Sequence, residues 1–228
     1  MLVIKNEKVR NWLKLLLPFV VIPVTVLAGA MAFAAKQYLL VSLLITIWTL
    51  LLFLTGFEKK KTGSRRMVIA AVMTALCIVG RFIPFFKPIT ALTIITAVYL
   101  GGETGFLVGA MAALLSNFYF GQGPWTPFQM LAWGMIGLTA GYLGKALKRR
   151  KALLLIFGVL SGVMYSLTMD VWTVLWYDGG FNASLYRGAV LASLPHMALY
   201  GISNFAFLFI CAKPFGEKLE RVKLKYGV

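Results

Sequence analysis

Apolar runs of about 20 residues alternate with short polar segments along the whole chain. A run of this length crosses the ~30 Å hydrocarbon core of a membrane as an α-helix. A membrane β-barrel would instead show short segments of alternating polarity. The pattern therefore predicts an all-α, polytopic membrane bundle with eight spans, at about 13–35, 38–57, 66–84, 88–101, 104–119, 126–144, 152–172 and 188–212.

Basic residues are grouped between the apolar runs, and this grouping predicts how the chain is oriented. Hydrophobic residues make up 60% of the 228, and the net charge is +16. With the N-terminus inside, 19 of the 23 Lys and Arg residues fall in four cytoplasmic segments, 5–14, 59–66, 145–151 and 213–225. Cytoplasmic loops of membrane proteins are enriched in such residues. We therefore expect both termini in the cytoplasm, contacts with anionic lipids and no nucleic-acid partner.

The first span imitates a secretory signal peptide, because a basic start precedes an apolar run. Leu13 to Ala35 is 23 residues, however, whereas the apolar region of a signal peptide has about 7–15. We expect this segment to remain as a span. Cys77 and Cys211 both fall inside predicted spans, which argues against a disulfide framework.

A basic segment at 58–66 divides the chain into two parts. Residues 1–62 form a predicted apolar hairpin, turned at Lys36-Gln37, with few polar side chains. Residues 63–228 form a predicted six-helix core in which Gly, Asn, Gln, Trp and Tyr concentrate. We expect the functional chemistry in the core and a packing or partner-contact role for the hairpin.

Glycine-rich positions predict close approaches between helices of the core. Spans 88–101 and 104–119 are short and meet at a Gly-rich turn, 101–105, which suits a cavity within the bundle. The spacings Gly137-xxx-Gly141 and Gly158-xxx-Gly162 are typical of helix packing in membranes, and we interpret them so.

Residues suited to catalysis are scarce. Of seven acidic residues only Asp170 falls within a predicted span, and His196 is the single histidine. Metal-ligand spacings, a nucleotide-binding loop and paired carboxylates are all missing from the sequence. We therefore expect no enzyme activity, no metal site and no intrinsic cofactor. If the chain belongs to an energised transporter, another protein has to supply the ATPase.

Polar and aromatic side chains gather near the outer ends of the core spans. Polar groups are costly in lipid, so they should face a cavity or one another. Two sets repeat every fourth residue and should each share one helix face, Trp125/Gln129/Trp133 and His196/Tyr200/Asn204. The candidates for substrate binding are Arg81, Asn117, Tyr119, Gln122, Trp125, Gln129, Trp133, Asp170, Trp172, Tyr177, His196, Tyr200 and Asn204.

Several of these candidates also have an ordinary structural explanation. Trp172 and Tyr177 would serve as anchors at the membrane interface. Arg81 would reach the outer headgroups with its long side chain. His196 would be a hydrogen-bonded interior histidine. The convergence of four spans on one end favours binding over these separate explanations.

The connector at 119–130 is the most informative segment, with the sequence Tyr-Phe-Gly-Gln-Gly-Pro-Trp-Thr-Pro-Phe-Gln-Met. It is uncharged, yet it holds two prolines, an indole and two amides. Ordinary polar residues would suffice for a turn, whereas this composition is typical of a small-molecule binding loop. A simple interfacial turn with an aromatic anchor is the alternative.

Three segments of the core resemble the substrate-binding S component of energy-coupling factor (ECF) vitamin transporters. Ala71-Val-Met-Thr-Ala75 is similar to the family's small-xxx-small motif. Residues 88–110 resemble its short second helix, tight Gly turn and Gly/Ala-rich third helix. Residues 117–130 resemble the branch assigned to cobalamin uptake. The resemblance covers about 66–212, and the N-terminal hairpin departs from the usual six-span core.

The resemblance implies a vitamin-binding subunit, without an ATPase of its own, in the cell membrane of a prokaryote. Ala71 and Ala75 would contact a transmembrane coupling subunit that two cassette ATPases drive. The subunit would capture its ligand outside and topple in the membrane to deliver it. Cobalamin or a related corrinoid is the expected ligand, because its planar ring and amide edges suit an aromatic, amide-rich mouth.

Other functions remain open from the sequence. Riboflavin-like or other heterocycles would use the same aromatic and amide groups. A membrane enzyme acting on lipid would need His or carboxylate clusters, which the sequence lacks. A structural subunit would not need a Trp-rich polar mouth.

Overall fold

The computed structural model describes residues 4, 6–32, 38–56, 60–84 and 86–226. Every regular element in these ranges is helical, which confirms the predicted helical class. The elements are α1 (Glu7–Leu16), the π-helical turn η1 (Leu17–Val21), α2 (Ile22–Ala32), α3 (Tyr38–Thr55), α4 (Lys60–Gly80), α5 (Ile89–Leu100), α6 (Gly102–Phe120), α7 (Thr126–Tyr142), α8 (Gly144–Arg149), α9 (Lys151–Asp178) and α10 (Ala183–Tyr226).

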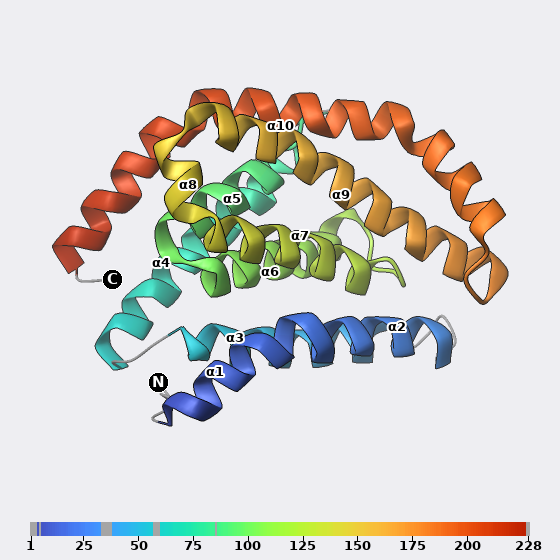
Figure 1. Cartoon of the computed structure of the whole chain (residues 1–228), viewed down its shortest axis with the longest axis horizontal. Helices are drawn as coiled ribbons and strands as arrows, with labels where there is room; N and C mark the ends of the chain where they lie inside the picture. Colours follow the sequence, from blue (N-terminus) through green and yellow to red (C-terminus); the bar gives the residue numbers. More distant parts are fainter. Residues whose placement is uncertain (1–3, 5, 33–37, 57–59, 85, 227–228) are drawn as a thin grey trace.

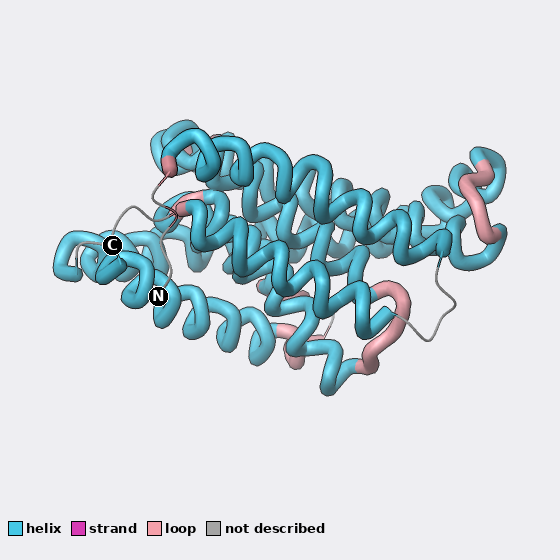
Figure 2. The backbone as a smooth tube through the Cα atoms, turned by 90° about the horizontal axis from the view of Figure 1, so that it is seen from below, coloured by secondary structure: helices cyan, strands magenta, loops and turns pink. Residues whose placement is uncertain are grey.

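Four helical stretches among the described residues are long and apolar enough to cross a membrane. They are Glu7–Met31, Tyr38–Thr55, Lys151–Asp178 and Ala183–Tyr226. The chain is thus a polytopic helical membrane protein. Figure 2 shows the helices running side by side. The eight-span count and the cytoplasmic placement of both termini remain predictions.

Helix α5 is an inner helix of the core. Its 12 residues are about 18 Å long at 1.5 Å per residue, well short of a full span. The side chains from Ile89 to Ala97 are all buried, and the helix packs against α4, α6, α7 and α10. The sequence predicted a span at 88–101 because a run that is apolar on every side has the same composition in lipid and in a protein core.

Helices α9 and α10 extend beyond the predicted spans. α9 continues to Asp178, and α10 is one helix of 44 residues that continues through Pro195 and Pro214. The last turns of α10 contain Glu, Lys, Leu and Arg at 217–221, which are strong helix formers. The helix therefore persists after its apolar part ends.

The predicted glycine contacts are confirmed. A Cβ atom built on Gly137 would lie 2.4 Å from the backbone of Gly105, so α6 and α7 touch through their main chains. In the same way, a Cβ atom on Gly162 would lie 2.8 Å from the backbone nitrogen of Gly201, where α9 meets α10. Both contacts are possible only because glycine has no side chain.

The N-terminal helices form a layer along one side of the core (Figure 1). α3 packs against α6 and α7, and α2 packs against α7 and α9. Lys14 Nζ lies 2.9 Å from Glu103 Oε1 and ties α1 to the start of α6. The predicted turn at Lys36-Gln37 lies outside the described residues, and the division into 1–62 and 63–228 remains a prediction.

Candidate functional site

A buried polar network joins the ends of α4 and α6, the start of α7 and the middle of α9. It begins at Arg81, which directly follows α4 and whose Nη1 donates hydrogen bonds to Ser116 Oγ and, at 2.8 Å, to Asn117 Oδ1. Asn117 Nδ2 donates in turn to Thr126 Oγ1 and to Gln129 Oε1, each at 2.8 Å. Both donors and the acceptor of the Asn117 amide are therefore in use, so its orientation is fixed.

Gln129 carries the network onward to a group of stacked aromatic rings. Its Nε2 donates to Tyr165 Oη at 3.1 Å. The Tyr165 ring stacks on Trp133, with centroids 4.6 Å apart, and meets Tyr200 edge-on at 5.2 Å. Trp133 Nε1 donates to Thr90 Oγ1 at 3.0 Å. Four helices, α5, α7, α9 and α10, thus meet around one aromatic stack.

Arg81 is held by neutral groups only. It is 9% exposed, and its guanidinium carbon lies 4.7 Å from the ring centre of Phe120 and 5.7 Å from that of Trp133. Within the described ranges, none of the ion pairs involves it, and its Nε is buried without a hydrogen-bond partner. A buried cation is stabilised best by an opposite charge, so this one has capacity left to bind an acceptor.

Lys87 adds a second cation near the same ring. Its Nζ lies 5.9 Å from the ring centre of Phe120. Burial, followed by the charge of Arg81, lowers the pKa of Lys87. Arg81 and Lys87 together make the part of the network next to Phe120 electropositive.

The loop at 121–125 is folded against the protein. Gly121 has φ +105°, which a residue with a side chain rarely adopts. The Trp125 ring lies directly over Gly123, where an added Cβ would be 2.3 Å from it, and meets Trp172 edge-on at 5.9 Å. Gln122 Nε2 donates to Leu114 O at 2.9 Å, and its Oε1 accepts from Thr126 Oγ1 at 3.0 Å.

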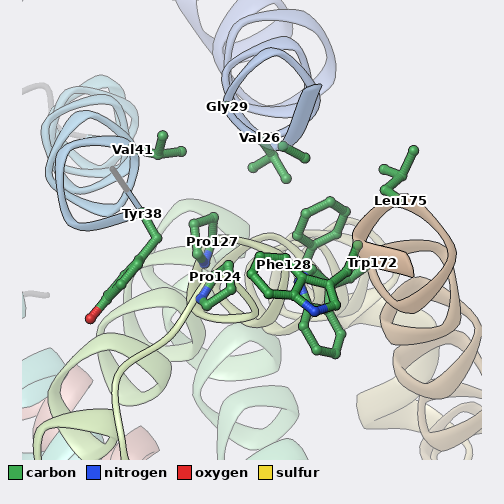
Figure 3. Close-up of a pocket in the computed structure, with 11 residues that line it drawn as sticks. Val26, Gly29, Tyr38, Val41, Pro124, Pro127, Phe128, Trp172 and Leu175 are labelled. Atoms are coloured by element: carbon green, nitrogen blue, oxygen red, sulfur yellow. The ribbon is translucent and has the colours of Figure 1, made fainter. Parts of the chain in front are cut away.

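A pocket of about 430 Å³, including space open to solvent, lies between this loop and the N-terminal layer. Pro124, Pro127 and Trp172 line it from the core, and Val26 and Val41 face them from α2 and α3, as Figure 3 shows. The N-terminal helices therefore face one side of the loop. The residues of the Arg81–Gln129 network do not line this pocket.

The structure brings together eight of the predicted site residues. They are Arg81, Asn117, Gln122, Gln129, Trp133 and Tyr200 in the network and its aromatic stack, with Trp125 and Trp172 beside it.

The other five candidates lie apart from the network. Tyr119 is 71% exposed and packs on Phe82, and Tyr177 is 75% exposed.

On α9 and α10, Asp170 accepts a hydrogen bond of 2.8 Å from Ser193. Asn204 donates to Gly158 O at 3.0 Å, and both contacts join α9 to α10. His196 is exposed, so the predicted stripe with Tyr200 and Asn204 does not extend to it. The first part of α10 contacts α9 through Tyr186 and Ser193.

Four members of the site are not among the sequence candidates. Ser116 accepts a hydrogen bond from Arg81, and Thr126 accepts one from Asn117. Tyr165 links Gln129 to the stack, and Thr90 accepts from Trp133. Thr126 stands within the informative loop and Ser116 directly precedes Asn117, and this adjacency is the signal that could have identified them.

The predicted partner residues lie on the free face of α4. Ala71 and Ala75 are exposed and line an apolar groove of about 650 Å³ with Met67 and Ile78 of the same helix. Leu50 of α3 and Leu107 of α6 line it too. The two alanines thus leave a shallow surface that another helix can approach closely.

The chain matches the family model described as "ECF-type riboflavin transporter, S component" over residues 61–221. The chain belongs to this family. A search of curated proteins and a search of solved structures each found no significant match.

The match confirms the prediction of an ECF S component in the cell membrane of a prokaryote. The protein is accordingly a transporter subunit, and the expectation that it is not an enzyme is confirmed. The match does not support the cobalamin branch, since the family is described by a different vitamin.

Proposed function

We propose that this S component binds riboflavin or a closely related flavin at its outer end and delivers it through an ECF module. The description of the matched family supports the choice of vitamin. The observation that carries the proposal is the stacked pair Trp133–Tyr165 bordered by Asn117, Gln129 and the buried Arg81.

These groups suit the chemistry of an isoalloxazine ring. The ring is flat and aromatic, and its pyrimidinedione edge carries both donors and acceptors. Trp133 and Tyr165 offer ring faces for stacking, which contributes about 1 kcal/mol for each good pair. Gln129 has a second amide donor, the side-chain oxygens of Asn117 and Gln129 can each accept a further hydrogen bond, and Arg81 offers donors only.

Two buried donors support this location. Arg81 Nε and Trp172 Nε1 are both buried, and neither has a hydrogen-bond partner among the residues that the structure describes. A buried donor without a partner costs about 1–3 kcal/mol, so such atoms often mark a functional site. Carbonyl or ring-nitrogen acceptors of a flavin would satisfy them.

The ligand prediction based on the loop, cobalamin, is less well supported. The aromatic stack is closely packed, and the Asn117 and Gln129 amides beside it are held by each other, by Thr126 and by Tyr165 at 2.8–3.1 Å. A corrinoid is far larger than an isoalloxazine and would have to displace more of this network.

For delivery, we propose that the groove over Ala71 and Ala75 receives the coupling subunit. Two cassette ATPases would drive that subunit, because the sequence carries no nucleotide-binding loop. The ligand itself would bind without nucleotide.

Calorimetric titration of the purified chain with riboflavin, cobalamin and cobinamide tests the proposal. We expect one riboflavin per chain and no heat from either corrinoid. Gln129→Leu should weaken riboflavin binding about tenfold, because a lost hydrogen bond is worth roughly 1.4 kcal/mol. Thr139→Val is the matched control, since that hydroxyl bonds only to its own helix α7.

The outcomes separate the levels of the proposal. Corrinoid binding without riboflavin binding would overturn the flavin assignment alone. Failure to bind any vitamin, together with failure to co-purify with cassette ATPases, would overturn the transport function.

A further inference from the structure

A pocket at the opposite end of the bundle has no role in the proposed vitamin site. It lies between α5, α8, α9 and α10 and has a volume of about 750 Å³, including space open to solvent. Figure 1 places α8 at the end of the molecule where both termini lie. The basic segments 145–151 and 213–225 belong to this end, which the charge distribution predicts to be cytoplasmic.

The pocket combines an apolar floor with a cationic rim. Its floor is formed by aliphatic side chains from four helices, Ile95, Val98, Leu147, Leu154 and Ala212. Its rim is formed by Lys148, Lys151, Lys213 and Tyr99.

The rim carries an excess of positive charge. Lys148 Nζ is neutralised by Glu220 Oε1 at 2.6 Å. Lys151 Nζ lies 3.8 Å from the ring centre of Phe209, and within the described part of the chain neither Lys151 nor Lys213 forms an ion pair. Two uncompensated cations therefore border an apolar hollow.

We propose that this pocket binds one anionic phospholipid of the cytoplasmic leaflet. Its phosphate would lie between Lys151 and Lys213, and the upper part of an acyl chain would lie on the floor between Leu154 and Ala212. Free phosphate would gain nothing from the floor, and a zwitterionic lipid would gain little from the rim. Only an anionic lipid matches both parts, and basic pockets between membrane helices are known to take such headgroups.

The binding would position the helices that line the pocket. α8 is a six-residue helix between α7 and α9, and the pocket joins it to α5 and to α10. A lipid held there would connect the C-terminal part of α10 to the core.

Native mass spectrometry of the purified full chain, with equal amounts of dioleoyl phosphatidylglycerol and dioleoyl phosphatidylcholine, tests the site. We expect one retained phosphatidylglycerol. The double variant Lys151→Gln, Lys213→Gln should weaken its retention about 30-fold, equivalent to ~1 kcal/mol for each lysine. The matched control Lys218→Gln, Arg221→Gln removes the same charge from α10 outside the pocket and should change retention less than about twofold.

A second variant tests the apolar floor. Ala212→Phe keeps every charge and fills the floor, so it should also reduce retention of phosphatidylglycerol. Millimolar inorganic phosphate should not displace the lipid. The melting temperature and gel-filtration profile of each variant confirm folding without reference to the vitamin, so this site and the proposed function can fail separately.

Several results would overturn the lipid site. Equal retention of the two lipids, or equal effects of the rim and control variants, would show attraction to surface charge alone. Displacement by inorganic phosphate, with no effect of Ala212→Phe, would indicate a free-phosphate site. Unchanged lipid retention combined with loss of ECF-module binding in the rim variant would assign the pocket to a protein partner.

Discussion

Arg81 is a charged side chain kept in the bundle by neutral partners. Ser116 and Asn117 accept its hydrogen bonds and two aromatic rings lie against it, while its Nε is left without a partner. Burying a charge in this way costs stability, so a role in binding is the better explanation for its presence.

Arg81→Gln should therefore separate binding from stability. The amide retains donors for Ser116 and Asn117 but removes the charge, so we expect the melting temperature to stay the same or rise. Riboflavin affinity should fall roughly 10- to 100-fold, because a hydrogen bond to a charged donor is worth about 1.5–3 kcal/mol. Titration calorimetry and thermal denaturation measure the two quantities. A large fall in melting temperature with unchanged affinity would show that Arg81 is structural.

Substitution of Trp125 tests whether the 121–125 loop retains the ligand. Its ring folds over Gly123 and contacts Trp172, so opening the loop has to break this contact. Trp125→Ala should speed riboflavin release about fivefold, since an aromatic pair contributes about 1 kcal/mol. Stopped-flow dissociation measures the rate. Trp176→Ala is the control, because this exposed ring also contacts Trp172 but belongs to α9 and not to the loop. Equal release rates for wild type and the Trp125 variant would show that the 121–125 loop does not retain the ligand.

Local sequence rules predicted part of this site. The cost of polar groups in lipid identified Asn117, Gln129 and Arg81, and the four-residue period placed Gln129 and Trp133 together. Tyr165 was missed because nothing in its own segment of α9 shows that Gln129 of α7 will reach it, 36 positions away. Single hydroxyls such as Thr90 are also common in membrane helices, where they usually bond to their own backbone.

At the scale of the element, helix type was predicted well and helix ends less well. Apolar runs indicate where a helix must be buried, either in lipid or in protein. They do not distinguish lipid from protein surroundings. For this reason α5 was predicted to be a membrane span, although it is a short helix buried inside the core. They also do not mark where a helix ends once its residues become polar, as in α10 beyond Pro214.

Helix α4 presents the surface on which coupling is expected to depend. The exposed alanines Ala71 and Ala75 let a partner helix approach closely. The double variant Ala71→Trp, Ala75→Trp should reduce co-purification with the coupling subunit to below about a tenth, while riboflavin binding by the isolated chain stays unchanged. Leu76→Trp is the matched control, since the side chain at position 76 points about 100° away from that of Ala75 around the helix. Normal co-purification of the double variant would contradict this assignment.

At the scale of the whole molecule, the two ends of the bundle differ in chemistry. One end holds the Arg81–Gln129 network, the 121–125 loop and the aromatic stack. The other holds α8, the lysine-rimmed pocket and most of the basic residues. The proposed function, in which a vitamin is captured outside and the subunit couples to ATPases inside, requires this polarity. It therefore predicts an orientation in the membrane with the network outward.

Labelling with a membrane-impermeant maleimide in intact cells tests this orientation. Single cysteines at Ser184, Lys8 and Lys218, in a chain with Cys77→Ala and Cys211→Ala, sample the start of α10, α1 and the far end of α10; all three positions are exposed. We expect labelling of Ser184→Cys only, and labelling of the other two after permeabilisation, because basic segments are retained in the cytoplasm.

Labelling of Lys8→Cys but not Lys218→Cys in intact cells would place the termini on opposite sides and require an odd number of spans. Labelling of both termini without Ser184→Cys would invert the molecule and place the vitamin network on the cytoplasmic side, which excludes uptake from outside by the proposed site.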